Sequence, residues 1–254
     1  METLFIGRQR FEEEQLLSTN AYALNLLRNG LAREGAVVIT KNQTAGRGQR
    51  GNTWEAEPGK NLTMSIVLLP SFMNVDQQFE LTKISSLAVV GFLSEFMEKE
   101  KDKIRIKWPN DIYLDSRKIA GILIENVVRD NQIAGSVVGI GLNINQEVFH
   151  SAVSAVSMKE CAGIEFNLRL CEEKLCEHLE SRYLQFLAGQ KVKIDSDYRR
   201  LLYKLNEEHR FSSGQNNFTG IIQGVTAEGK IQIILGSGEQ KEFDLKELKF
   251  EQEL

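Results

Sequence analysis

Apolar residues recur at helical spacing in four segments of the chain. Ser18-Thr19-Asn20 precedes an apolar run that stops before Gly30, which predicts a helix with a hydroxyl N-cap and a glycine at its end. A longer helix is predicted over about 76–101, where apolar side chains return every three or four residues. Two more helices are predicted, one over 161–189 and one over roughly 195–208.

Short apolar runs rich in β-branched residues predict strands between these helices. The predicted strands cover residues 36–40, 62–69, 103–107, 117–125 and 132–143. Arg129-Asp130-Asn131, which separates the last two, has the composition of a tight turn. These two strands are therefore predicted to pair as a hairpin.

The pattern changes near Glu207. Beyond it come three short strand-like runs, broken by glycine-containing turns, over residues 218–224, 230–235 and 239–245. Short, evenly spaced strands of this kind predict a small β barrel. The sequence thus predicts a larger domain over residues 1–206 and a small barrel domain over residues 207–254.

Composition excludes several classes of protein. The chain has 254 residues, 42% of them hydrophobic, and a net charge of -4, which is typical of a globular protein and argues against general nucleic-acid binding. No apolar run approaches the roughly 18 residues of a membrane helix, and no signal peptide is visible. Three cysteines argue against a disulfide framework and predict a reducing compartment, the cytoplasm.

A glycine-rich loop follows the predicted strand 36–40. Gly46-Arg47-Gly48-Gln49-Arg50-Gly51 matches G-x-G-x-x-G, but a dinucleotide loop must open a helix, and residues 52–60 lead instead into the next strand. A P-loop needs lysine where Asn52 stands, and the H-R-D and D-F-G sequences of a kinase do not occur. Glycine amides and two arginines still suit an anion, although a solvated flexible loop explains the composition equally well.

A second charged segment ends the predicted strand 103–107. Lys107-Trp108-Pro109-Asn110-Asp111 is followed seven residues later by Lys118. Lysines suit a phosphate and a carboxylate suits Mg²⁺, so the segment is a candidate nucleotide site. Taken alone, the segment is explained more simply as a charged hairpin in which Asp111 or Asp115 pairs with Lys107, Arg117 or Lys118.

The cysteines and histidines do not predict a metal site. Cys171, Cys176 and His178 fit neither a C-x-x-C knuckle nor one face of a helix. We expect the two cysteines to be small buried apolar residues. Neither His150 nor His209 has a nucleophilic partner at a recognisable spacing.

Taken together and in order, these motifs resemble those of the biotin–protein ligases, also called biotin–[acetyl-CoA-carboxylase] ligases. The resemblance extends over nearly the whole chain and rests on Ser18-Thr19-Asn20, on Gln43 to Gly51 with Trp54, on Lys107 to Asp111 with Arg117 to Gly121, and on Gly139-Ile140-Gly141-Leu142-Asn143. The lysine–tryptophan–proline–asparagine–aspartate block is the most specific of the four. In combination the motifs outweigh the simpler explanations of the loop and of the hairpin.

The resemblance implies an α+β fold. It consists of a mixed sheet flanked by helices, akin to the catalytic domains of class II aminoacyl-tRNA synthetases, followed by an SH3-like barrel. It also implies a two-step reaction, in which biotin and ATP form biotinyl-5′-adenylate and the adenylate then acylates a lysine of a biotin carboxyl carrier domain. Mg²⁺ is the implied metal, with Asp111 as its candidate ligand.

The resemblance also implies a role for each matching residue. Lys118 and Arg47 are the expected catalytic residues, with Lys118 bridging the biotin carboxylate and the α-phosphate. The expected biotin-binding residues are Ser18, Thr19, Asn20, Gln43, Gly46, Arg47, Gly48, Gln49, Lys118 and Gly121. The expected ATP- and adenylate-binding residues are Arg47, Arg50, Trp54, Lys107, Asn110, Lys118 and Asn143. Trp54 and Trp108 are expected either to wall the site or to pack in the core.

One position departs from the family pattern. Gln49 stands where familiar members carry a second arginine, two residues after Arg47. A neutral side chain there is expected to hold the adenylate less tightly, unless Arg50 takes its place.

Two other functions share some of these features. A lipoate or octanoyl ligase has the same fold, and a non-catalytic protein could hold biotinyl-adenylate without transferring it. The glycine-rich loop with Trp54 and the Lys107 to Asp111 block favour biotin, and Arg47 with Lys118 favours catalysis. Only some seventeen residues precede Ser18, so we expect a ligase without the N-terminal DNA-binding domain of bifunctional members. The charge and the short apolar runs predict no nucleic-acid or membrane partner. The resemblance leaves a homodimer as one option.

Overall fold

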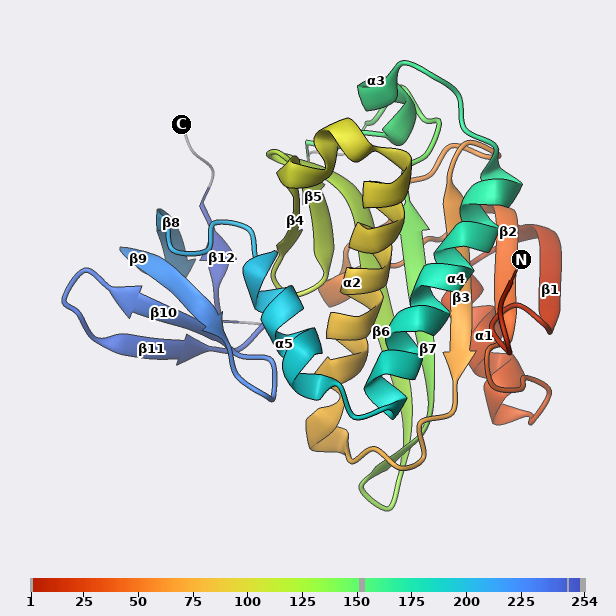
Figure 1. The fold of residues 1–254 in the computed structure, drawn as a ribbon, viewed down its shortest axis with the longest axis horizontal. Coiled ribbons are helices and arrows are strands. Elements are labelled where there is room, and N and C mark those ends of the chain that lie inside the picture. The colour runs from red at the N-terminus through yellow and green to blue at the C-terminus, as the bar shows by residue number, and fades with distance from the viewer. Residues whose placement is uncertain (1, 151–153, 246, 252–254) are drawn as a thin grey trace.

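The computed structural model describes residues 2–150, 154–245 and 247–251, the side chain of Arg50 excepted. Its larger part is built on a seven-stranded sheet (Figure 1). In spatial order the strands are β1 (Arg10–Leu16), β2 (Val37–Gln43), β3 (Leu62–Leu68), β7 (Gln132–Leu142), β6 (Arg117–Arg129), β5 (Asp111–Leu114) and β4 (Ile104–Lys107).

The sheet is mixed, because β1 runs parallel to β2 while every other neighbouring pair is antiparallel. The predicted hairpin of β6 and β7 is confirmed, and Asp130 and Asn131 turn it with φ angles of 50° and 63°. Strand β1 was not predicted from the sequence. Its centre is Glu12-Glu13-Glu14, and charged residues of this kind protect an edge strand from pairing with another chain.

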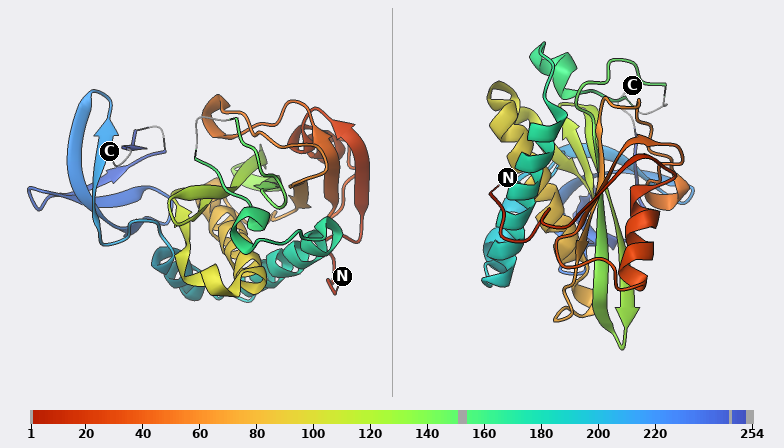
Figure 2. Two further views of the ribbon diagram at one scale, coloured as in Figure 1. Left: turned by 90° about the horizontal axis from the view of Figure 1, so that it is seen from above. Right: turned by 90° about the vertical axis from the view of Figure 1, so that its right-hand side faces the viewer.

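Helices cover the two faces of the sheet unequally. Helices α2 (Phe79–Phe96) and α4 (Leu168–Leu187) lie on one face, whereas α1 (Thr19–Arg28) lies on the other (Figure 2). The first face holds the main apolar core, to which β3 contributes Leu62, Met64 and Ile66. A smaller apolar cluster lies under α1 and includes Val67 and Val137. Because this cluster is small, α1 covers only part of the second face of the sheet.

Several predicted helices are shorter than the sequence indicated. α2 ends at Phe96, and residues 98–103 form the 3-10 helix η3 before β4. The segment 161–189 is not one helix, because Gly163 in the left-handed region ends α3 (Met158–Ala162) before α4 begins. α5 spans Lys191–Arg200, and the residues from 201 to 207 form turns and bridges, so the prediction of a helix to 208 was wrong.

The C-terminal strands form a separate antiparallel sheet. Its spatial order is β11 (Gln240–Phe243), β10 (Ile231–Leu235), β9 (Asn216–Val225), β8 (Glu208–Ser213) and β12 (Lys249–Phe250). This sheet lies beside α5 and the edge strand β4 (Figure 1). The indole N–H of Trp108 donates to the Gly229 carbonyl at 2.9 Å, which ties the two parts together.

The fold can be compared with the expectations about the cysteines and about membrane helices. Cys171 and Cys176 are fully buried in the apolar core, as expected, and burial raises the pKa of the Cys176 thiol to about 12. No helix in the described part of the chain is both long enough and apolar enough to cross a membrane.

Candidate active site

The candidate site lies on the face of the sheet that α1 leaves open. Because side chains alternate along a strand, every second residue of β3, β7 and β6 faces this side. The pairing register aligns these residues in two rows, Thr63–Gly141–Gly121 and Ser65–Gly139–Leu123. The central strand therefore presents only glycines, and the floor of the site is lowest along β7.

The two glycines of β7 make room for particular side chains. A Cβ atom at Gly139 would lie 2.1 Å from Asn20 Oδ1, and one at Gly141 would lie 2.3 Å from the Trp54 ring. Neither neighbour could remain in place beside any larger residue. The sequence Gly139-Ile140-Gly141 thus explains how a helix and a loop reach the same stretch of sheet.

The N-terminus of α1 forms one wall of the pocket. Ser18 caps the helix, and its Oγ accepts a hydrogen bond from the Ala21 backbone N–H at 3.4 Å. A capping hydroxyl that accepts in this way still has its own proton to donate. The backbone N–H of Thr19 donates to Gln43 Oε1 at 2.9 Å, so the carboxamide N–H groups of Gln43 are the ones left for a ligand.

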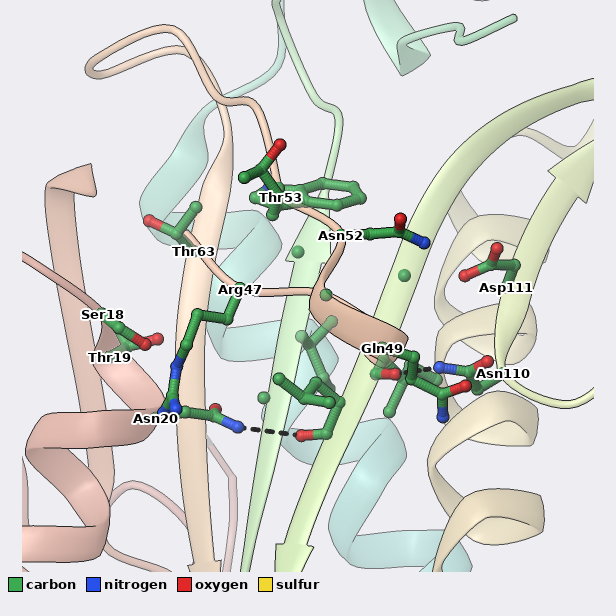
Figure 3. Close-up of a pocket in the computed structure, with 18 of the residues that line it drawn as sticks. Ser18, Thr19, Asn20, Arg47, Gln49, Asn52, Thr53, Thr63, Asn110 and Asp111 are labelled. Carbon is green, nitrogen blue, oxygen red and sulfur yellow. Dashed lines mark hydrogen bonds between the residues drawn. The ribbon is translucent and has the colours of Figure 1, made fainter. Parts of the chain in front are cut away.

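Asn20 is a buried polar residue whose hydrogen-bonding groups are all used inside the protein. Its Nδ2 donates to the Leu123 carbonyl at 3.1 Å and to Glu125 Oε2 at 2.8 Å, and its Oδ1 accepts from Ser65 Oγ at 2.6 Å. The bond to Leu123 is drawn in Figure 3. Asn20 lines the pocket, as expected, and its bonds fix the wall of the site to the floor.

The glycine-rich loop folds back over the pocket. Arg47 pairs with Thr53 in an isolated bridge, and the Trp54 N–H donates to the Gly46 carbonyl at 3.0 Å. A Cβ atom at Gly46 would lie 2.4 Å from the Trp54 carbonyl oxygen, so the two ends of the loop approach this closely only with glycine at this position. Residues Gln49–Gly51 form the short 3-10 helix η1 at the mouth of the pocket (Figure 3).

Lys118 and Asp111 lie on the opposite wall. Lys118 Nζ lies 2.7 Å from Asp111 Oδ1, which is one of the pairings that the hairpin alternative had allowed, and both residues line the pocket. A bulge at Ile119 shifts the alternation of β6, and the Lys118 side chain therefore lies along Gly121, three residues away. Asp111 is the first residue of β5, whereas the sequence had indicated a bend.

The bend itself comes one residue earlier, at Pro109 and Asn110. Asn110 Nδ2 donates to the Ile122 carbonyl, and Tyr198 Oη donates to the Pro109 carbonyl at 2.7 Å. Asn110 lines the pocket beside Asp111 (Figure 3). Trp108 belongs to the apolar core, whereas Trp54 lines the pocket, so the alternative left open for the two tryptophans is resolved differently for each.

Three expected nucleotide-binding residues differ in where they lie. The residues that line the pocket do not include Asn143, which is buried next to Lys118. Its Nδ2 donates to the Lys118 carbonyl at 3.5 Å and to the Val156 carbonyl at 3.1 Å, while its Oδ1 has no hydrogen-bond partner within the described residues. Lys107 lies outside the cavity, with Nζ 4.8 Å from the centre of the Tyr113 ring and 5.1 Å from that of Phe250; burial lowers its pKa. The side chain of Arg50 lies outside the described part.

The remaining expected residues lie together except for Gly46, which lies against Trp54 at the base of the loop and is not one of the lining residues. The pocket is lined by Ser18, Thr19, Asn20, Gln43, Arg47, Gly48, Gln49, Trp54, Asn110, Asp111, Lys118 and Gly121, to which the structure adds Asn52, Thr53, Thr63 and Leu123 among others. Sequence reasoning missed Glu125, which bonds to Asn20 and Arg47. The sequence signal that could have indicated Glu125 is its position as a charged residue within the apolar run of β6.

The arrangement defines a site for a ligand that carries both an anionic group and an uncharged polar group. Arg47 and Lys118 supply positive charge, Ser18 and Gln43 supply donors for a polar group, and the Trp54 ring supplies an apolar wall. Within the described residues no cluster of three or more histidine, cysteine, aspartate or glutamate side chains could hold a metal alone.

Comparison with known proteins places the chain in a family. Residues 13–143 match the Biotin/lipoate A/B protein ligase family, and the chain belongs to that family. It is 27% identical over 245 residues to the bifunctional ligase/repressor BirA of Bacillus subtilis, a match that covers 95% of this chain and 74% of the relative. It is 26% identical to the biotin–[acetyl-CoA-carboxylase] ligase of Mycobacterium tuberculosis, over 86% of this chain and 80% of that one.

Solved structures support the fold independently. The chain superposes on a biotin protein ligase from Aquifex aeolicus in complex with biotin and ATP with a TM-score of 0.78 and 23% identity, covering 96% of this chain and all of the other. A biotin protein ligase from Leishmania major in complex with biotin gives a TM-score of 0.65 at 20% identity. The expected combination of a large mixed sheet with helices and a C-terminal antiparallel sheet is thus confirmed.

Proposed function

We propose that the chain is an ATP-dependent biotin ligase that biotinylates one lysine on a carrier domain of a biotin-dependent carboxylase. The observation that carries this proposal is the pocket itself, in which Arg47 and Lys118 meet the polar wall of α1 on a glycine floor. The relatives named as biotin–[acetyl-CoA-carboxylase] ligases support the choice of carrier.

In the first step the biotin carboxylate attacks the α-phosphorus of ATP, which forms biotinyl-5′-adenylate and releases pyrophosphate. Both reactants are anions, so their approach requires positive charge at the point where they meet. Lys118 Nζ supplies that charge. Its ion pair with Asp111 holds the ammonium against the pocket before the ligands arrive.

The polar end of biotin is the ureido ring, which both donates and accepts hydrogen bonds. The proton of Ser18 Oγ and the Nε2 of Gln43 are donors for its carbonyl oxygen, because Ser18 uses only a lone pair in the cap and Gln43 uses only Oε1 toward Thr19. Asn20 acts differently, since its side chain bonds to Ser65 of β3 and to two residues of β6 and so holds the start of α1 against the sheet.

The adenine ring is a donor through its amino group. Asn143 Oδ1 is a buried acceptor without a partner in the described residues, and an acceptor of this kind is stabilised when a ligand donor reaches it. The buried indole N–H of Trp54 also lacks a hydrogen-bond partner within the described part of the chain, and as a donor it suits an acceptor nitrogen of the ring. Trp54 lines the pocket and Asn143 bonds to the backbone of Lys118, so both residues fit contacts to a nucleotide base near Lys118.

Mg²⁺ also fits the site. It is commonly bound by one or two protein carboxylates together with substrate phosphates, and Asp111 is a carboxylate on the pocket wall. Bound there, the ion would neutralise phosphate charge as pyrophosphate departs.

In the second step the amine of the carrier lysine attacks the acyl carbon of the adenylate and AMP leaves. The loop of residues 46–51, which lies over the pocket, excludes water from the mixed anhydride while the carrier approaches.

In this proposal residues 1–206 are the catalytic domain, of the class II synthetase-like type. Residues 207–254 form an SH3-like domain beside it.

The test is transfer of label from biotin to a carrier domain of acetyl-CoA carboxylase in the presence of ATP and Mg²⁺. We expect label on one lysine and none on a carrier in which that lysine is arginine. The same assay with lipoate separates the two branches of the family, and transfer of lipoate in place of biotin would overturn the proposal. Adenylate formation without any transfer would indicate a protein that only binds the adenylate.

A further inference from the structure

Glu125 is a carboxylate at the edge of the pocket to which neither the sequence motifs nor the proposed reaction gives a role. It lies on β6 two residues beyond Leu123 and four beyond Gly121, so it faces the same side of the sheet as the pocket floor. Its side chain is 27% exposed.

The position of Glu125 is set by a buried neighbour. Its Oε2 accepts a hydrogen bond from Asn20 Nδ2 at 2.8 Å, and Asn20 is itself held by Ser65 and by the Leu123 carbonyl. The carboxylate is therefore fixed by the sheet on one side and by α1 on the other. It is a rigid acceptor at the end of the pocket where the polar wall of α1 lies.

The second partner of Glu125 is Arg47. Arg47 Nη2 donates to the same oxygen at 3.1 Å, and in Figure 3 the Arg47 side chain runs from the loop down toward Asn20. The backbone bonds of the loop join its own residues, for example Gly48 to Asn52 at 2.7 Å. In the described part of the chain, the bond to Glu125 is the hydrogen bond that connects residues 46–53 to the sheet.

We propose that Glu125 is a positioning residue that acts through Arg47: its fixed carboxylate holds the guanidinium, and with it the loop, over the pocket before biotin binds. The inference rests on the proposed function, because that function is what gives Arg47 its catalytic role. The Arg47 side chain is 46% exposed, so the ion pair is weak enough to rearrange when an anionic ligand arrives.

The first experiment measures the loop without any ligase reaction. Trypsin cleaves after arginine, so we expect cleavage at the Arg47–Gly48 bond of the ligand-free protein to be faster in Glu125→Gln than in the unchanged chain. The matched control is Glu14→Gln, which removes another glutamate ion pair of the same sheet, with Lys41 at 2.7 Å, away from the pocket. Equal cleavage rates in all three proteins would overturn the proposal.

The second experiment measures the coupling of Glu125 to Arg47. We expect Glu125→Gln to raise the KM for biotin about two- to fivefold, the range that a partly exposed ion pair supplies, with a smaller change in kcat. In an Arg47→Gln background the same substitution should have no further effect on biotin binding, measured by Trp fluorescence. Additive effects would mean that Glu125 acts independently of Arg47, which contradicts the proposal.

The two proposals fail in different ways. If the unchanged chain does not label the carrier, the proposed function fails, and the trypsin comparison still reports whether Glu125 holds the loop. If the unchanged chain is active and Glu125→Gln matches Glu14→Gln in both loop cleavage and KM, the role of Glu125 is wrong and the function stands.

Discussion

The two faces of the seven-stranded sheet use the same strands for opposite purposes. On the face under α2 and α4, β3 and β7 present Met64, Ile66 and Ile140, which are almost completely buried in the main core. On the other face, the residues next to them in the sequence include Thr63, Gly139 and Gly141, which line the pocket. In this stretch β3 and β7 therefore stabilise the fold with their even-numbered residues and form the site with their odd-numbered ones.

The difference teaches what a binding face requires. An apolar core is stabilised by filling space, whereas a pocket needs empty volume and polar groups whose bonds are already arranged. On the pocket face the space is created by glycine and is filled by Trp54 and Asn20, which arrive from other elements. Substitutions on the two faces should consequently separate activity from stability.

The largest effect is expected on the pocket face, from Lys118→Met. Because Lys118 Nζ supplies the charge at the point where the two anions meet, we expect kcat for adenylate formation to fall by about 10²–10³-fold. Pyrophosphate release measures this step without the carrier. Lys101→Met, which changes an exposed lysine of η3, is the control and should keep full activity.

The sharpest test of the comparison uses two neighbouring residues of β7. Gly141→Ala places a methyl group against the Trp54 ring, so we expect the KM for ATP to rise at least tenfold and the free energy of unfolding to fall by about 1–3 kcal/mol. Leu142→Ala, on the other face, should lower the free energy of unfolding by about 2–5 kcal/mol and leave KM unchanged. Denaturant unfolding and steady-state kinetics are measured on both variants. A KM effect of Leu142→Ala as large as that of Gly141→Ala would refute the division between faces.

The smallest effect is expected at the mouth of the pocket. Gln49 lines the pocket in the loop, and Gln49→Arg adds a cation beside the adenylate, so we expect the adenylate to leave the protein a few-fold more slowly. Release of labelled adenylate from a preformed complex measures the rate. An unchanged or faster release would show that this position does not control retention. Gln49→Lys tests whether charge alone is sufficient.

Local sequence signals predicted the elements that contain strong periodicity. The helix after Ser18, the hairpin of β6 and β7, and the strand at 62–68 follow from a cap, a turn and an apolar run that each need only neighbouring residues. Strand β1 escaped prediction because its glutamates remain exposed at the edge of the sheet. Such a strand is defined by its pairing with β2 rather than by burial.

Residue spacing could not predict which site residues lie inside the pocket. Lys107 and Trp108 belong to the most specific motif, yet Lys107 lies against Phe250 of β12 and Trp108 donates to Gly229 between β9 and β10. Their surroundings depend on an element more than a hundred residues away in the sequence. No local pattern contains that information.

The sequence by itself determined the family, the order of the motifs and the residue types that the chemistry needs, because these are properties of short segments. The tertiary structure alone decided that glycines of β7 open the floor, that Asn20 uses its side chain inside the protein, and that Glu125 meets Arg47 across 78 positions of the chain. These contacts depend on strand register and on how α1 and the loop pack on the sheet. Register is fixed by the folded sheet as a whole, since a shift of one residue would exchange its two faces.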